Sequence, residues 1–347
     1  MRQHHRFRAA LAALFASLGL SLAIGPVAAA DQALIDAAKK EGHVTWYTSL
    51  IVDQFARPAA AAFEKAYGIK VDFVRADSAE ISLRLLNESK AGHVQADVYD
   101  GFGAPALVQQ GIVASYIPEA AKSLPAQFHD PDGHWAATNL YVLTPGYNTE
   151  LVPKGMEPKN FQDLLDPQWK GKMAWNSQPS VAAASGFIGL VLADMGEEKG
   201  TAYLEALAKQ NVAGLKVAAR QVLDEVIAGE YAIALQIFNN HAVISAAQGA
   251  PVAWIPMNPA TGILSVFSVT EGAPHPNAGR LFVDYLVSAD GQKLFRDADY
   301  LPVDPAVPPR VPSLRPDGDK FRAIYFTPEE YYGSLPKWTK LFTDIFP

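Results

Sequence analysis

Residues 43–74 read HVTWYTSLIVDQFARPAAAAFEKAYGIKVDFV, and this stretch decides the fold. Its two ends are rich in β-branched and aromatic side chains, which predicts two short strands, His43–Thr48 and Ile69–Val74. The alanine-rich stretch between them predicts a helix over residues 51–67, with a kink or interruption at Pro58. A strand, a helix and a second strand in this order are typical of parallel strands covered by a helix.

The same alternation continues along the rest of the chain. Further helices are predicted over residues 31–41, 79–90 (with Ser78 as the N-cap), 104–110, 160–165, 181–195, 197–209, 221–228, 239–248, 276–287 and 291–297. Further strands are predicted over residues 96–99, 135–147, 172–175, 231–235, 252–255 and 264–269. This pattern predicts the α/β class, with parallel strands and helices on both faces of a sheet.

A chain of this length suggests two lobes rather than one core. We expect lobe 1 to comprise residues 31–137 and 266–315, and lobe 2 residues 138–265. The aromatic C-terminal tail, residues 316–347, is expected to pack on one of the lobes.

The first 30 residues have the pattern of a cleavable signal peptide. Three arginines precede an apolar run over residues 9–24, and Ala28, Ala29 and Ala30 supply small residues before Asp31. The run is too short for a membrane-spanning anchor. The chain also has no cysteine that could carry a lipid. An exported protein without an anchor needs a second membrane to retain it, so we expect a Gram-negative periplasm.

Charge and composition exclude several kinds of function. Removal of residues 1–30 takes away three arginines and no acids, which changes the net charge from −7 to −10. An acidic chain argues against nucleic acid or anionic membranes as partners. The absence of cysteine excludes thiol catalysis and thiolate metal sites. The sequence has no HExxH, GxSxG or GxxxxGK[ST] motif, so we expect no enzymatic activity and no cofactor.

Ordered segments of the chain resemble one family of transport proteins. They are VTWYTSL (residues 44–50), FEKAYGIKVDFV (63–74), ADVYDG (96–101), YVLTPGYN (141–148), DLLDPQWKGK (163–172) and GEYAIAL (229–235). Together they resemble the extracellular solute-binding proteins of ABC importers, in the ferric-iron-binding-like branch of type II periplasmic binding proteins. The resemblance implies two lobes joined by crossing strands and a cleft that closes on a small-molecule solute. It also implies a permease with its ATPase subunits as partners, and we expect a monomer.

The residues depart from the iron-binding members of this branch. Those members hold Fe³⁺ with a histidine, a glutamate and two adjacent tyrosines. Here no histidine follows Tyr47, Phe102 stands where the glutamate is expected, and His241-Ala242 stands where the tyrosines are expected. A hard trivalent ion prefers anionic oxygen ligands. The sequence therefore predicts no metal site at these positions, although a metal binder with other ligands stays open as an alternative.

The candidate ligand-binding residues lie where a strand ends and a helix begins. In open α/β sheets such loops line the ligand crevice, and helix N-termini there favour anions. The candidates are Tyr47, Ser49, Arg75, Ser78, Phe102, Asn176, Ser177, Ser180, Arg220, Asn239 and His241.

Several candidates also have a purely structural interpretation. Ser49 and His241 could cap helices, and Phe102 could belong to the core. Arg75 could instead pair with Asp77 or Glu80 on the surface. The arginines and helix N-termini favour a small anionic or zwitterionic solute such as a phosphonate, a phosphorylated compound or a carboxylate. An exported hydrolase is the alternative of another class, and it would require a close pair of carboxylates.

Overall fold

In the computed structural model of this chain, residues 31–101, 103–180, 182–316 and 320–346 are described. The predicted signal peptide and Phe102 therefore lie outside the described residues. Among the described helices, none combines the length and the hydropathy needed to cross a bilayer.

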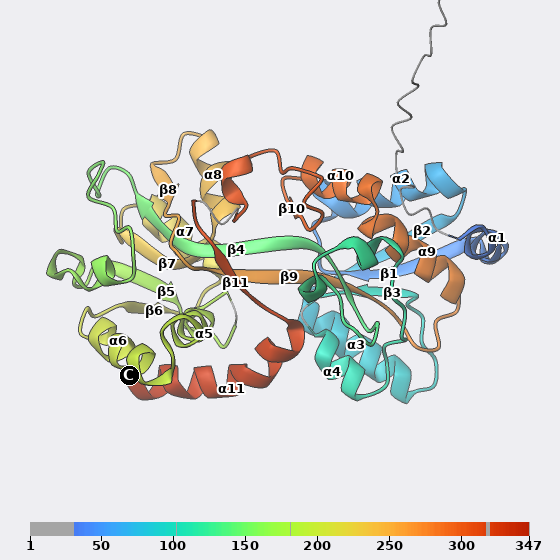
Figure 1. Cartoon of the computed structure of the whole chain (residues 1–347), viewed down its shortest axis with the longest axis horizontal. Coiled ribbons are helices and arrows are strands. Elements are labelled where there is room, and N and C mark those ends of the chain that lie inside the picture. The colour runs from blue at the N-terminus through green and yellow to red at the C-terminus, as the bar shows by residue number, and fades with distance from the viewer. Residues whose placement is uncertain (1–30, 102, 181, 317–319, 347) are drawn as a thin grey trace, which may run out of the picture.

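Helices and strands alternate over most of the chain (Figure 1). The α-helices are α1 (Gln32–Glu41), α2 (Arg57–Tyr67), α3 (Ser78–Lys90), α4 (Ala104–Gln109), α5 (Ala184–Met195), α6 (Glu197–Ala208), α7 (Ala219–Ile227), α8 (Asn239–Ala247), α9 (Pro276–Val287), α10 (Ala289–Asp297) and α11 (Pro328–Ile345). The strands are β1 (His43–Thr48), β2 (Lys70–Arg75), β3 (Val98–Asp100), β4 (Ala136–Asn148), β5 (Met173–Asn176), β6 (Ala213–Leu215), β7 (Ile233–Phe238), β8 (Val252–Trp254), β9 (Ala260–Val269), β10 (Leu301–Pro302) and β11 (Ala323–Phe326).

Residues 43–74 fold as predicted, with two local differences, one of which is that β2 begins and ends one residue later than expected. β1 covers the predicted residues, and the predicted helix is divided into a π-helical turn, Val52–Ala56, and α2. Pro58 is the second residue of α2, which follows the π-helical turn directly. It has no N–H to donate, so the change from π-helix to α-helix occurs at the predicted interruption. Gly68 ends α2 with φ 72°, a left-handed conformation that glycine adopts without strain.

One mixed sheet runs through the whole molecule in the order β2-β1-β3-β9-β4-β7-β5-β6. The pairs β1–β2, β1–β3, β5–β6 and β5–β7 are parallel, as the alternating pattern predicts. β4 and β9 are antiparallel to each other and pass between the two halves (Figure 1). The boundaries expected from the sequence, 137/138 and 265/266, fall inside these two crossing strands.

Two large hydrophobic cores lie on either side of the crossing region. The first contains Trp46, Phe55 and Phe282, and the ring of Phe55 stacks on that of Phe295 with centroids 4.0 Å apart. The second is built mainly from residues 152–257 and includes Trp175. We call the bodies around these cores the first half and the second half. Full burial of each large apolar side chain stabilises the fold by roughly 1.5–3 kcal/mol.

The C-terminal helix α11 contacts both halves. Near its start, Glu329 accepts a 2.8 Å hydrogen bond from Trp135 Nε1, and Tyr332 lines a hollow between α3 and α4. Further along, Trp338 covers Gly189 of α5, where a Cβ atom would come within 2.6 Å of the indole ring. α11 therefore packs on α4 of the first half and on α5 of the second.

Candidate functional site

Several helices that follow strand ends begin without a side-chain cap, and three of them start next to predicted site residues. Among the described residues, no side chain caps α3, α5 or α8. The N-terminal N–H groups of a helix have no partner within the helix and carry a partial positive charge. These three helix starts are therefore suited to an anionic group. At α3 the N-cap residue is Asp77, and Ser78, predicted as the cap, is the first helical residue instead.

A buried carboxyl group organises the end of β1. Asp100, at the end of β3, is fully buried and accepts hydrogen bonds from Trp46 Nε1 at 2.8 Å and from the backbone N and Oγ of Ser49, both at 2.9 Å. Desolvation raises the pKa of Asp100 to about 6, although these hydrogen bonds favour its charged form. No local pattern marks Asp100 as a site residue, because its partners lie about fifty residues away in the chain.

Three aromatic rings connect the two halves beside Asp100. Tyr141 of β4 packs against Tyr300 at 5.9 Å and against Phe238, at the end of β7, at 5.3 Å between ring centroids. Burial raises the pKa of Tyr300 to about 12 and that of Tyr141 well above its usual value. Both phenols are therefore neutral at physiological pH. No local pattern in the sequence marks these three rings either.

The first turn of α8 carries three polar side chains. Asn239 is buried and donates from Nδ2 to the carbonyl of Leu314 at 2.9 Å. Asn240 is 9% exposed, and its amide atoms are not among the buried polar atoms that lack a partner. His241 Nδ1 is buried and has no partner among the described residues. Desolvation, together with the nearby charge of Arg220, lowers the pKa of His241 to about 4, so its ring is neutral at pH 7.

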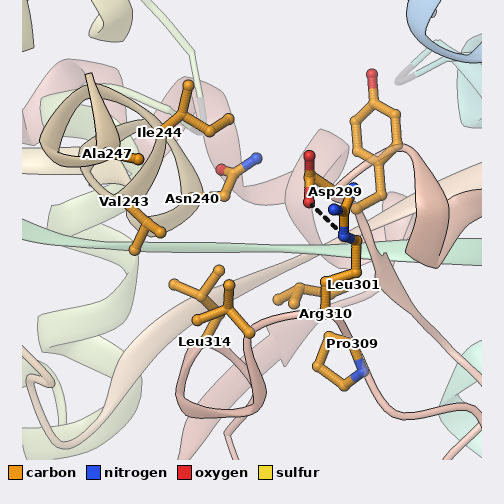
Figure 2. A pocket seen from close by; sticks show the side chains of 11 residues that line it. Asn240, Val243, Ile244, Ala247, Asp299, Leu301, Pro309, Arg310 and Leu314 are labelled. Atoms are coloured by element: carbon orange, nitrogen blue, oxygen red, sulfur yellow. Dashed lines mark ion pairs between the residues drawn. The ribbon is translucent and has the colours of Figure 1, made fainter.

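A cavity of about 320 Å³ lies between α8 and residues 299–314 (Figure 2). We call it the α8 cavity, and its lining residues are Asn240, Val243, Ile244, Ala247, Asp299, Tyr300, Leu301, Pro309, Arg310, Val311 and Leu314. At its edge, Arg310 Nε lies 3.6 Å from a carboxylate oxygen of Asp299. Tyr300 joins this cavity to the aromatic group around Tyr141. The apolar lining residues Val243, Tyr300, Leu301, Val311 and Leu314 all pack with the first core. On the other face of α8, Ala242 belongs to a smaller apolar cluster with Val222 and Leu223.

The predicted residues before α5 form local turns. Asn176 is buried and accepts from the backbone N of Gln178 at 2.8 Å, while Ser180 Oγ accepts from the backbone N of Ala182 at 3.2 Å. Ser177 lines a different cavity, beside Trp175 and the end of α11.

Tyr47 and Ser78 lie on the α3 side of the sheet. Tyr47 is fully buried, donates from its hydroxyl to Glu88 at 2.7 Å and has the guanidinium of Arg84 4.6 Å from its ring centre. Ser78 is partly buried in the first turn of α3, and its carbonyl accepts a 2.7 Å hydrogen bond from Ser82. In this conformation the Tyr47 hydroxyl therefore serves packing within the first half.

The two predicted arginines have partners on the surface. Arg75 lies 3.7 Å from Asp77, the ion pair considered as its structural interpretation. Arg220 donates to Ser245 Oγ at 2.9 Å and to Asp224 at 2.7 Å. Both side chains are more than two-fifths exposed, so these ion pairs contribute little to stability.

The strand ends offer few ligands for a metal ion. Among the described residues, one group of three potential ligands lies close together, Asp130, Asp132 and His134, on the loop before β4. At the end of β3 the carboxylate is that of Asp100. Its oxygens already accept hydrogen bonds from Trp46 and Ser49. This donor set does not match what a trivalent ion requires.

A family model, related sequences and solved structures all match this chain. A family model described as bacterial extracellular solute-binding protein matches residues 97–324. A putative 2-aminoethylphosphonate-binding periplasmic protein of Salmonella paratyphi A is 27% identical, over 80% of each chain. The iron-bound HitA structure from Pseudomonas aeruginosa has a TM-score of 0.72 at 20% identity and covers 87% of this chain and 99% of its own. AfuA from Actinobacillus pleuropneumoniae, solved with fructose-6-phosphate, has a TM-score of 0.70 at 22% identity and covers 88% and 98%. These two likenesses confirm the predicted type II periplasmic binding protein fold.

Proposed function

Because this chain belongs to the bacterial extracellular solute-binding proteins, we propose that it captures a small anionic or zwitterionic organic solute between its two halves. It is a periplasmic solute-binding protein of an ABC importer, and such proteins work with a permease and its ATPase subunits. We assign residues 31–137 and 266–315 to lobe 1 and residues 138–265 to lobe 2, with the crossing strands as the hinge.

One observation carries the proposed solute class. At the start of α8, an uncapped helix N-terminus lies beside His241, whose buried Nδ1 has no hydrogen-bond partner among the described residues. A buried polar group without a partner costs about 1–3 kcal/mol, which a ligand that hydrogen-bonds to it would recover. The helix dipole makes an anionic group the favoured occupant.

The names of related proteins support an organic anion. The Salmonella paratyphi A relative is named for 2-aminoethylphosphonate, and AfuA was solved with fructose-6-phosphate. Both compounds carry a phosphorus oxoanion. HitA was solved with iron, but a ferric function here would need anionic ligands beyond Asp100 at the strand ends.

The proposal extends to location and assembly. Residues 1–30 act as a cleavable signal peptide that exports the chain to a Gram-negative periplasm, where it functions as a monomer without a cofactor. Solute binding favours the closed arrangement of the lobes over the open one, because closure follows only when the ligand binds that state more tightly.

Calorimetric titration of the purified protein tests this function directly. The titrants are 2-aminoethylphosphonate, fructose-6-phosphate and ferric citrate. Any compound that mass spectrometry identifies among the small molecules that co-purify is titrated as well. We expect an organic anion to bind with a Kd of roughly micromolar or tighter, about −8 kcal/mol, and to reduce the radius of gyration in small-angle scattering. Binding of ferric ion alone, or turnover of the bound compound, would refute the proposal.

A further inference from the structure

The α8 cavity has an apolar wall that a simple phosphate or sugar phosphate would leave unused. We propose that this cavity is the subsite for an uncharged apolar group of the solute, so that the solute is a small anion or zwitterion with an aliphatic or aromatic substituent. This inference rests on the proposed function, because it assigns the rest of the same ligand to the space next to the α8 start.

The residues on α8 line one face of the helix. Asn240, Val243, Ile244 and Ala247 follow a spacing of three and four residues, which places their side chains along one stripe. Asn240 is at the N-terminal end of this stripe, where the anion site lies, and the apolar side chains follow it (Figure 2). A ligand with its charged group at the helix start would therefore direct its remaining atoms along Val243, Ile244 and Ala247.

The opposite wall is apolar as well. Leu301, Val311 and Leu314 face α8 across the cavity. Hydroxyl groups placed here would lose water without gaining hydrogen bonds, which disfavours a sugar ring. The volume of about 320 Å³ is at the small end of the range for ligand sites, which fits a solute of low molecular mass.

Two polar contacts remain at the ends of this space. Asn240 offers two N–H donors and one carbonyl acceptor at the inner end. The pair Asp299 and Arg310 lies at the edge, with both side chains about half exposed. A zwitterion could pair its ammonium with Asp299 and its acid group with the α8 start, while the apolar substituent stays between them.

The test uses matched compounds that differ only in the apolar group. Calorimetry is performed with aminomethylphosphonate and with the phosphonate analogues of alanine, valine and leucine, and in parallel with glycine, alanine, valine and leucine. We expect affinity to rise about fourfold for each buried methylene, the factor that corresponds to about 0.8 kcal/mol.

Two variants on α8 separate cavity filling from a general effect on the helix. Ala247→Phe would fill the cavity from an exposed position, and Ala246→Phe adds the same ring at an exposed neighbour that does not line the cavity. We expect Ala247→Phe to abolish the gain in affinity along the series. Ala246→Phe should preserve both that gain and the affinity of the smallest binding member.

The outcomes distinguish the two proposals. If the small anions bind and affinity does not rise along either series, the cavity is a space between the lobes and the subsite inference is wrong, while the proposed function stands. The subsite inference is also wrong if Ala247→Phe and Ala246→Phe change the gain in affinity along the series equally. If no organic anion binds at all, the proposed function fails and this inference fails with it.

Discussion

Replacing Asp100 by asparagine removes a buried carboxyl group whose charge the fold disfavours. In the folded protein the pKa of Asp100 is raised from 3.8 to about 6, chiefly because burial strips water from the carboxylate. The folded state therefore holds this proton more tightly than the unfolded chain. It follows that acidification from pH 7 should stabilise the wild-type protein relative to a variant that has no group to titrate here.

The expected size of the effect follows from the two pKa values. A pKa difference of one unit corresponds to about 1.4 kcal/mol, so the interval from 3.8 to about 6 corresponds to about 3 kcal/mol. This contribution is fully present below pH 3.8 and is lost as the pH rises through 6. Asp100→Asn should also cost about 1–3 kcal/mol at every pH, because the new amide turns a donor toward either Trp46 Nε1 or Ser49.

Urea unfolding followed by tryptophan fluorescence, at intervals from pH 4 to pH 7.5, measures the difference between wild type and variant. We expect the advantage of the wild type to grow by most of about 3 kcal/mol toward pH 4. Asp290→Asn is the control, since the Asp290 side chain is 73% exposed, and its difference from wild type should vary little with pH. An Asp100→Asn difference that stays constant, or that shrinks toward pH 4, would contradict the stated desolvation of this carboxyl group.

Three further measurements test other parts of the structure. Asn240→Ala should weaken binding of the solute about tenfold and leave the melting temperature nearly unchanged, as calorimetry and thermal unfolding can check, because the amide lines the α8 cavity. Arg75→Ala should change stability by less than about 0.5 kcal/mol, since its ion pair with Asp77 is exposed, and a tenfold or greater loss of solute affinity would support its role in anion binding. Gly189→Ala should cost about 1–3 kcal/mol in denaturant unfolding, since its Cβ would meet the ring of Trp338 at 2.6 Å; an unchanged midpoint would mean that α11 is loosely packed.

The sequence was most informative where local signals act alone. The β-formers of His43–Thr48 and the proline that begins Pro276–Val287 gave both elements their observed bounds. Ser78 was a wrong N-cap prediction because Asp77 and Ser78 are both good capping residues, and the local sequence does not distinguish them. β7 continues to Phe238, three residues beyond its predicted end, because pairing with β4 extends it.

The candidate site depends more strongly on contacts between distant parts of the chain. The expectation that ligands bind where a strand ends and a helix begins identified Asn239 and His241, which lie at the start of α8. It could not reveal the wall of the α8 cavity, because residues 299–314 follow no strand-to-helix turn that the sequence marks. Asp100 stands in the quoted segment ADVYDG, yet its importance follows from Trp46 and Ser49, which reach it only in the folded protein.

The placement of α11 affects how far the molecule can change shape. The two crossing strands by themselves would form a simple flexible joint, but α11 adds a brace that rests on α4 at one end and on α5 at the other. Pro336, which cannot donate a backbone hydrogen bond, lies between Tyr332 and Trp338, so bending of the brace should concentrate there. The free-energy difference between the open and closed arrangements then depends partly on α11 side chains that do not contact the solute.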